Sequence, residues 1–191
     1  MENWLQGAIA FPHLLTRAAL LLIPPLIMCF ISALASPGQT PEGQVSPIRV
    51  EYDEKSDTRR VTLNPIILVS RRHEELRLGA FSSHQGKVPL TPKEVALVFL
   101  SLTTAATNKY ESARQLTITA DENRFGCGET QRTTQTEKGL FMETLMTVVP
   151  FETFVKIAQA KEVKLKLGIT EVKLEPEHVL MLRAAASYMG K

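Results

Sequence analysis

Cys127 is the residue whose surroundings most favour chemistry, because it lies between Gly126 and Gly128. Flanking glycines leave a thiol accessible and let the backbone approach a ligand, and a thiolate is a competent nucleophile when a base lowers its pKa. No histidine lies near Cys127 in the sequence. We therefore favour the simpler interpretation, a structural cysteine at a bend that the glycines permit.

Three histidines, His73, His84 and His178, are the groups that a catalytic thiol or a metal ion would need as partners. His73 precedes two glutamates but lacks the second histidine, one helical turn later, that completes a helical zinc site. Only folding can bring one of these histidines to Cys127. We expect surface histidines and no metal site, and we keep Cys127 with an adjacent histidine as the alternative, a catalytic site.

Three other patterns suggest ligand binding, but each has a simpler explanation. The glycines around Cys127 begin a dinucleotide-binding pattern, yet Gln131 stands where the third glycine belongs. Residues 79–87 end in Gly-Lys, but Val88 replaces the Ser or Thr that holds magnesium in a phosphate loop. The acidic stretch 121–123 offers oxygen ligands to calcium but is typical of a hairpin turn. We expect no cofactor.

The beginning of the chain predicts export. Residues 18–31 are apolar and uncharged, and Ala33 and Ala35 follow at the spacing that a leader peptidase recognises. The apolar run is shorter than the roughly 20 residues that span a membrane as a helix. We expect cleavage after Ala35, which makes residues 1–35 a signal peptide and the product periplasmic or extracellular. An uncleaved membrane anchor and lipidation of Cys29 are the alternatives.

Charge and composition narrow the choice of partner. The formal net charge is only +2 and basic pairs are interleaved with acids, so the dense positive field that nucleic acid requires is missing. Cleavage removes the single tryptophan, Trp4, which disfavours a sugar-binding surface. It also leaves Cys127 without a second cysteine for a disulfide. We expect a protein partner, no nucleic acid, and a membrane only if the N-terminal segment is retained.

Beyond the leader, the sequence predicts a tether and one domain. Residues 36–47 are rich in Pro, Gly and Gln and too poor in apolar side chains to fold. Residues 48–191 are enough for a single core. Alternation of apolar and polar residues predicts a hairpin from 48–52 and 59–63 and a strand at 116–120, and we expect further strands at 66–70, 76–81 and 141–149.

The segment 91–101 is ambiguous. Thr91-Pro92 followed by Glu94 is a helix-start signature. The following run is rich in β-branched and aromatic residues, and its length suits a buried strand. We favour the strand.

The pattern changes at Pro150. Apolar residues recur at helical spacing from Phe151, residues 163–174 alternate like a hairpin, and Pro176 opens a last helix. Strands first and helices late predict an α+β fold: a mostly antiparallel or sandwich-like β region, then a C-terminal helix-hairpin-helix unit.

The C-terminal unit also resembles a family. The similarity is carried by Phe154, Ile157, Ala158, Ala160, Val163, Leu167, Gly168, Leu174, Leu182 and Arg183, with a fainter echo in 92–101. This pattern is similar to that of uncharacterised bacterial exported domains, some of them lipoproteins. The resemblance implies a fold and export, and it brings no activity with it.

Together these observations predict an exported, non-enzymatic domain that binds a protein partner through its sheet surface or serves as an envelope component. The alternative is a thiol-dependent or hydrolytic enzyme that uses Cys127 with a spatially adjacent histidine. The absence of a catalytic constellation in the sequence favours the first.

Overall fold

The computed structural model describes residues 46–104 and 109–191. The predicted signal peptide, Cys29 and residues 36–45 of the predicted tether lie outside the described residues. Within the described ranges, no helix combines the length and the apolar character needed to cross a membrane.

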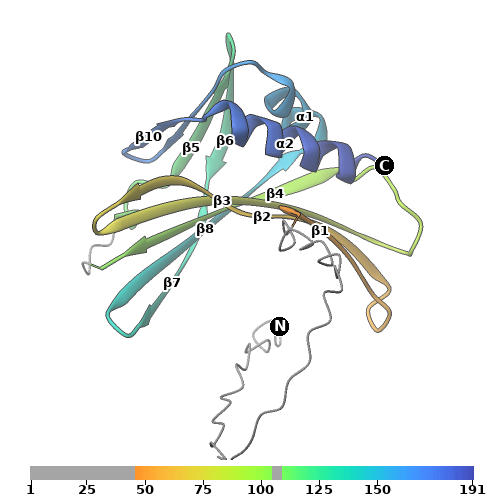
Figure 1. The fold of residues 1–191 in the computed structure, drawn as a ribbon, viewed down its shortest axis with the longest axis horizontal. Helices are drawn as coiled ribbons and strands as arrows, with labels where there is room; N and C mark the ends of the chain where they lie inside the picture. Colours follow the sequence, from red (N-terminus) through yellow and green to blue (C-terminus); the bar gives the residue numbers. More distant parts are fainter. Residues whose placement is uncertain (1–45, 105–108) are drawn as a thin grey trace, which may run out of the picture. The chain divides into compact units, whose positions relative to one another are not determined.

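The described residues form ten strands and two helices (Figure 1). In chain order these are β1 (Ile48–Asp53), β2 (Thr58–Arg71), β3 (Glu74–Gln85), β4 (Glu94–Thr103), β5 (Gln115–Ala120), β6 (Asn123–Glu129), β7 (Gln131–Glu137), β8 (Leu140–Pro150), α1 (Phe151–Gln159), β9 (Val163–Leu167), β10 (Thr170–Lys173) and α2 (Pro176–Met189).

The strands form two antiparallel sheets. One has six strands in the order β1-β2-β3-β4-β8-β7, and the other has four in the order β10-β9-β5-β6. The predicted α+β class with mostly antiparallel strands is therefore confirmed. β9 and β10 do pair with each other, but β9 also pairs with β5. The C-terminal hairpin is thus the edge of the smaller sheet, where the sequence had predicted part of a helix-hairpin-helix unit.

Two local predictions can be compared directly with the strands. Segments 59–63 and 66–70 are parts of one long strand, β2, whose register shifts between Leu63 and Ile66. Pro65 lies in that irregular stretch and has no N–H to donate to a ladder. The ambiguous segment 91–101 is a strand, β4, from Glu94 onwards. Its pairing with β3 and β8 on both sides outweighs the local helix signal.

The core lies between the two sheets and under the helices. Both helices lie on the same side of the six-stranded sheet (Figure 1). This face, here called the inner face, contributes Leu63, Phe99 and Leu145, the smaller sheet contributes Leu116 and Ile118, and the helices contribute Phe154 and Leu182; all are almost completely buried. These residues belong to one apolar cluster with members from both sheets and both helices. Burial of apolar surface is the main favourable contribution to folding, so this cluster stabilises the packing of the sheets and helices together.

Candidate functional site

Cys127 lies in β6 with its side chain half-buried against the core. Its thiol makes a long contact of 3.8 Å to the carbonyl oxygen of Phe125, and its own carbonyl accepts a hydrogen bond from Thr147 Oγ1 at 2.8 Å. Desolvation by burial raises the pKa of the thiol to about 11. Because the thiolate is the reactive form, this environment suppresses nucleophilic chemistry at neutral pH.

The three candidate histidines lie on other elements. His73 follows β2 and bonds Thr104 Oγ1 at 2.9 Å, and His84 near the end of β3 bonds the carbonyl oxygen of Gln85 at 3.0 Å. His178 is in the first turn of α2, where its Nδ1 accepts a hydrogen bond from the Glu175 N–H as part of a capping box. None of the interactions among the described residues joins a histidine to Cys127.

We expect Cys127 to react slowly with thiol reagents. With a pKa of about 11, roughly one thiol in a thousand is ionised at pH 8, so alkylation should be roughly a hundred times slower than for an exposed cysteine. Peptide mass spectrometry after timed alkylation separates Cys127 from Cys29. Rapid labelling of Cys127 at pH 6 would contradict this expectation and revive the thiol enzyme.

The weaker motifs are explained by backbone geometry. Gly128 has a φ of 79° and lies where the β5–β6 register shifts, which is the conformation a β-bulge needs. Residues 79–85 of the phosphate-loop-like stretch belong to strand β3. In the acidic turn, Asp121 Oδ1 accepts hydrogen bonds from the backbone N–H groups of Lys161 and Glu162, at 3.0 and 2.9 Å. Among the described residues, no cluster of three or more His, Cys, Asp or Glu side chains could hold a metal ion.

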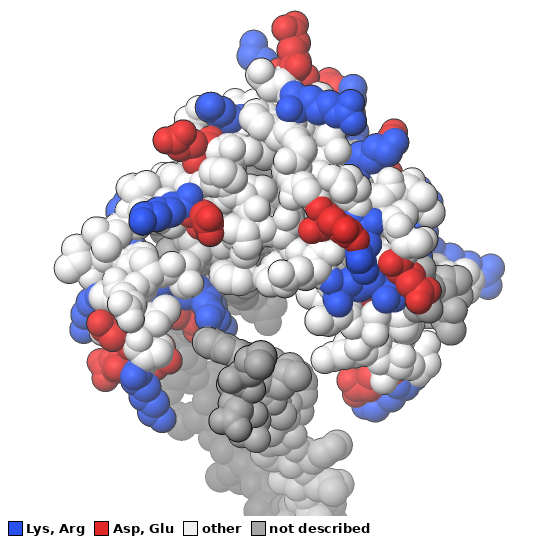
Figure 2. Space-filling model, turned by 180° about the vertical axis from the view of Figure 1, so that it is seen from behind, with Lys and Arg blue, Asp and Glu red and all other residues white. Residues whose placement is uncertain are grey.

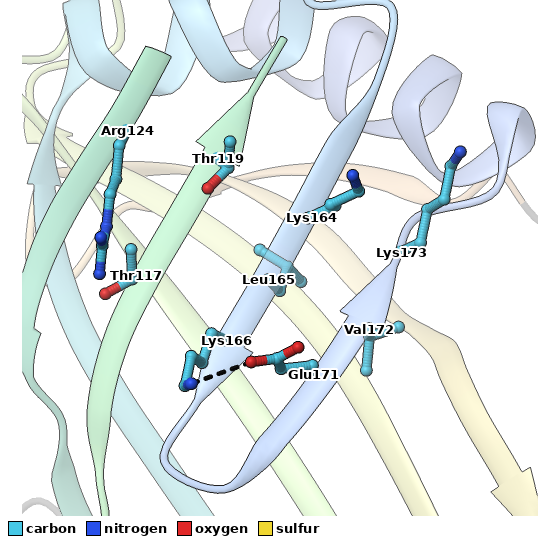
Figure 3. A pocket seen from close by; sticks show the side chains of 9 residues that line it. All are labelled: Thr117, Thr119, Arg124, Lys164, Leu165, Lys166, Glu171, Val172 and Lys173. Atoms are coloured by element: carbon cyan, nitrogen blue, oxygen red, sulfur yellow. Dashed lines mark ion pairs between the residues drawn. The ribbon is translucent and has the colours of Figure 1, made fainter. Parts of the chain in front are cut away.

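The smaller sheet carries a charged groove on the face turned away from the core (Figure 3). The groove has a volume of about 500 Å³. Its lining combines cations and hydroxyls from all four strands: Thr117, Thr119, Arg124, Lys164, Leu165, Lys166, Glu171, Val172 and Lys173.

Three of the four cations that line this groove are paired, but with only two carboxylates, so about half of the positive charge is compensated. Lys166 pairs with Glu171 at 2.9 Å, and Lys164 and Lys173 both pair with Glu162, at 2.8 and 3.0 Å. Hydrogen bonds from Lys164 and Lys173 lower the pKa of Glu162 to about 2, so its carboxylate stays charged at neutral pH. A polyanion would have to displace these pairs, which weakens the groove as a binding site.

The surface as a whole mixes both signs of charge. On the face drawn in Figure 2, Lys and Arg side chains alternate with Asp and Glu, and uncharged surface lies between them. This face therefore lacks a broad patch of positive charge, which electrostatic steering of a polyanion would require.

The face of the six-stranded sheet that points away from the helices has an apolar centre on β4 and part of β8, whereas the outward side chains of β7 are polar. β4 presents Val98, Leu100 and Leu102 there, all partly exposed, although Val95, Leu97 and Phe99 on its other face are already buried. A sheet with one solvated face normally alternates apolar and polar residues, so apolar side chains on both faces indicate that both faces are covered.

Strand β8 extends this surface in register with β4. Met146 pairs with Val98, Met142 with Leu102, and Val148, which is 49% exposed, with Ala96. We call this surface the outer apolar face, formed by Val98, Leu100, Leu102, Met142, Met146 and Val148. The signal for it was present in the sequence, because residues 95–102 contain only one polar side chain, Ser101.

Comparison with protein-family models, with curated proteins and with solved structures found no match to this chain. The resemblance of residues 154–183 to bacterial exported domains therefore stays a prediction. The functional argument rests on the residues and their geometry.

Proposed function

We propose that this chain is an exported, non-enzymatic domain that binds a protein partner through the outer apolar face. The observation that carries the proposal is a set of three apolar cross-strand pairs on β4 and β8, on the side of the sheet opposite to both helices. The pairs are Ala96–Val148, Val98–Met146 and Leu102–Met142, and Leu100 lies opposite Thr144 in the same row. Contiguous partly exposed apolar surface of this kind marks an interaction site more often than chance exposure of single residues does.

The chemistry of the face suits a protein surface. Met142 and Met146 have flexible, polarisable side chains that adapt to an irregular apolar partner. Arg77 and Glu75 form an ion pair on the neighbouring strand β3, whose outward positions continue the same face. An apolar centre flanked by polar groups is the usual anatomy of a protein–protein interface.

The environment of Cys127 disfavours the enzymatic alternative. Its thiol has a raised pKa, and each of the three histidines has a hydrogen bond to another group. Export remains part of the proposal on the strength of residues 18–31 and the cleavage site after Ala35.

Site-specific photo-crosslinking in the native envelope tests the proposal. A photoreactive residue in place of Val148 should give one adduct of defined mass with another protein, whereas the same residue in place of Thr119, in the groove of the smaller sheet, should give none. Adding Met146→Lys to the Val148 probe should reduce the adduct at least tenfold, because a charge would be buried in the interface.

The matched control is Thr117→Lys, which adds the same charge to the other sheet and should leave the Val148 adduct unchanged. Equal amounts of adduct from the probes at Val148 and Thr119, or no adduct from the probe at Val148, would contradict the proposal. An adduct with the mass of two copies of this chain would show that the outer apolar face binds a second copy and not a different protein.

A further inference from the structure

Strand β7 forms one edge of the six-stranded sheet (Figure 1). Among the described residues, β8 is its only partner strand, along the whole length from Gln131 to Glu137. Every side chain from Thr133 to Glu137 is exposed, so neither face of this part of the strand packs against the core. The other side of β7 therefore presents backbone N–H and C=O groups that pair with no strand of the described residues, and such an edge is a template for pairing with a further strand.

The other edge strands that the structure describes have features that oppose pairing, which the centre of β7 lacks. β1, at the opposite edge of the same sheet, carries charges at Arg49, Glu51 and Asp53. β10 is only four residues long, and β6 is interrupted by the β-bulge at Gly128. Short length, charge and bulges are the means by which proteins protect exposed edges. β7 is seven residues long and pairs regularly with β8, and its central residues 133–136 are uncharged.

The sequence of β7 is complementary to itself in one antiparallel register. With Thr134 opposite Thr134 of a second copy, every residue of β7 has a partner in the second copy. The remaining pairs are Thr133–Gln135, Arg132–Thr136 and Gln131–Glu137. No pair in this register sets like charges opposite each other, and paired threonines can hydrogen-bond across the strands.

Other registers of the same edge are less favourable. A shift by one residue would set side chains of opposite faces against each other. A shift by two residues in one direction places Glu129 opposite Glu137 of the second copy, and in the other direction it places Arg132 opposite Lys138. Like charges directly opposite each other are destabilising, and both shifts shorten the paired segment. The charges therefore select the register centred on Thr134.

We propose that two copies of this chain associate through β7, antiparallel and with Thr134 at the twofold axis, so that their six-stranded sheets form one continuous sheet. The pairing adds roughly six to eight backbone hydrogen bonds, depending on which residues of β7 point their N–H and C=O groups outward. Each copy uses the same edge, so the contact closes on itself and gives a dimer. This edge is separate from the outer apolar face, and the inference does not rest on the proposed function.

Disulfide crosslinking of the full chain, in a Cys29→Ser background, tests the contact and its register. Thr134→Cys should oxidise to a linked dimer, because directly opposite residues have Cα atoms about 4.5 to 5.5 Å apart, within the range of a disulfide. Thr136→Cys is the matched control, because Thr136 is also an exposed threonine and lies on the same face of the same strand. Its two copies would lie about 14 Å apart along the strands, so it should give at least about tenfold less dimer on a non-reducing gel.

A charge test uses the same readout. Adding Thr133→Lys/Gln135→Lys to Thr134→Cys places lysine opposite lysine at two points of the dimer and should reduce crosslinking about tenfold. Adding Gln131→Lys/Thr133→Lys introduces the same two charges at the same spacing, but opposite Glu137 and Gln135 of the second copy, and should leave crosslinking unchanged.

Circular dichroism checks that each variant is folded, and if a lysine variant fails to fold, the comparison of Thr134→Cys with Thr136→Cys decides. Equal crosslinking of these two cysteine variants would indicate random collision and overturn the proposal. No dimer from Thr134→Cys, or an equal effect of the two lysine pairs, would overturn it as well.

Discussion

Replacing Arg132 with methionine is expected to lower the free energy of unfolding by about 3 to 5 kcal/mol, because it leaves a charge buried without its partner. Arg132 Nε lies 2.7 Å from Oε1 of Glu143, whose side chain is completely buried. The same oxygen accepts from the backbone N–H of Tyr110 at 3.3 Å, and Oε2 has no hydrogen-bond partner. The guanidinium is therefore the main compensation for this carboxylate.

The double variant Arg132→Met/Glu143→Leu separates loss of the pair from loss of charge balance. Replacing a buried ion pair by apolar residues of similar volume is often neutral, so the double variant should recover more than half of the loss. Full recovery is not expected, since Tyr110 N–H loses its acceptor. Urea denaturation of the wild type, the two single variants and the double variant gives the four free energies of unfolding that this comparison needs.

Arg114→Met is the control for this cycle. Arg114 pairs with Glu129, whose side chain is 61% exposed, and exposed pairs contribute at most about 1 kcal/mol. A double variant as unstable as Arg132→Met would contradict the argument and show that the network has a role in packing that apolar side chains cannot replace.

Glu143 shows how a buried charge follows from strand periodicity. Phe141, Leu145 and Val149 alternate along β8, and Glu143 occupies the same row. The predicted strand at 141–149 is confirmed as part of β8, and its alternation places the carboxylate in the core. Periodicity did not identify Arg132 as the partner of Glu143, because Arg132 lies in β7, a strand that the sequence pattern did not predict.

Strand β7 was not predicted, because its sequence carries no apolar alternation. Residues 129–138 are polar, and nearly every side chain of β7 is exposed. Its extended form depends on pairing with β8 along Gln131 to Glu137, an interaction of tertiary structure. An edge strand lacking an apolar face cannot be distinguished from a loop by pattern alone.

The outer apolar face and the pairing of β2 with β3 differ in the same way. The outer apolar face could be anticipated from the continuous apolar run in β4, since such runs are typical of strands covered on both faces. The placement of Arg59 opposite His84 could not be anticipated, because it depends on the register that pairs residues 25 positions apart. Register is set by the apolar pattern and by the turn between the strands, but two register shifts along β2 displace the pairing, so counting from the turn does not place Arg59 opposite His84.

Gly168→Ala is expected to lower the free energy of unfolding by about 3 kcal/mol or more, through strain and a steric clash together. Gly168 has a φ of 56°, which glycine adopts more readily than other residues. A Cβ at this position would lie 1.9 Å from the carbonyl oxygen of Ala113. That oxygen is part of the backbone, so the β9–β10 turn and the segment before β5 would have to separate.

Gly139→Ala isolates the strain from the clash. Gly139 has a φ of 80°, but a Cβ there would have no neighbour within 4 Å, so its replacement should cost only about 1 kcal/mol. Gly126→Ala should be nearly neutral, because it introduces neither strain nor a clash. The φ of Gly126 is not positive, and a Cβ there would have no neighbour within 4 Å. Thermal and urea unfolding of the three variants should therefore show the largest loss of stability for Gly168→Ala, a much smaller loss for Gly139→Ala, and the smallest for Gly126→Ala. Equal losses of stability for Gly168→Ala and Gly139→Ala would contradict this prediction. They would mean that the β9–β10 turn moves away from Ala113 without cost, although Gly168 N–H donates a 2.9 Å hydrogen bond to the carbonyl oxygen of Gln115 at the start of β5.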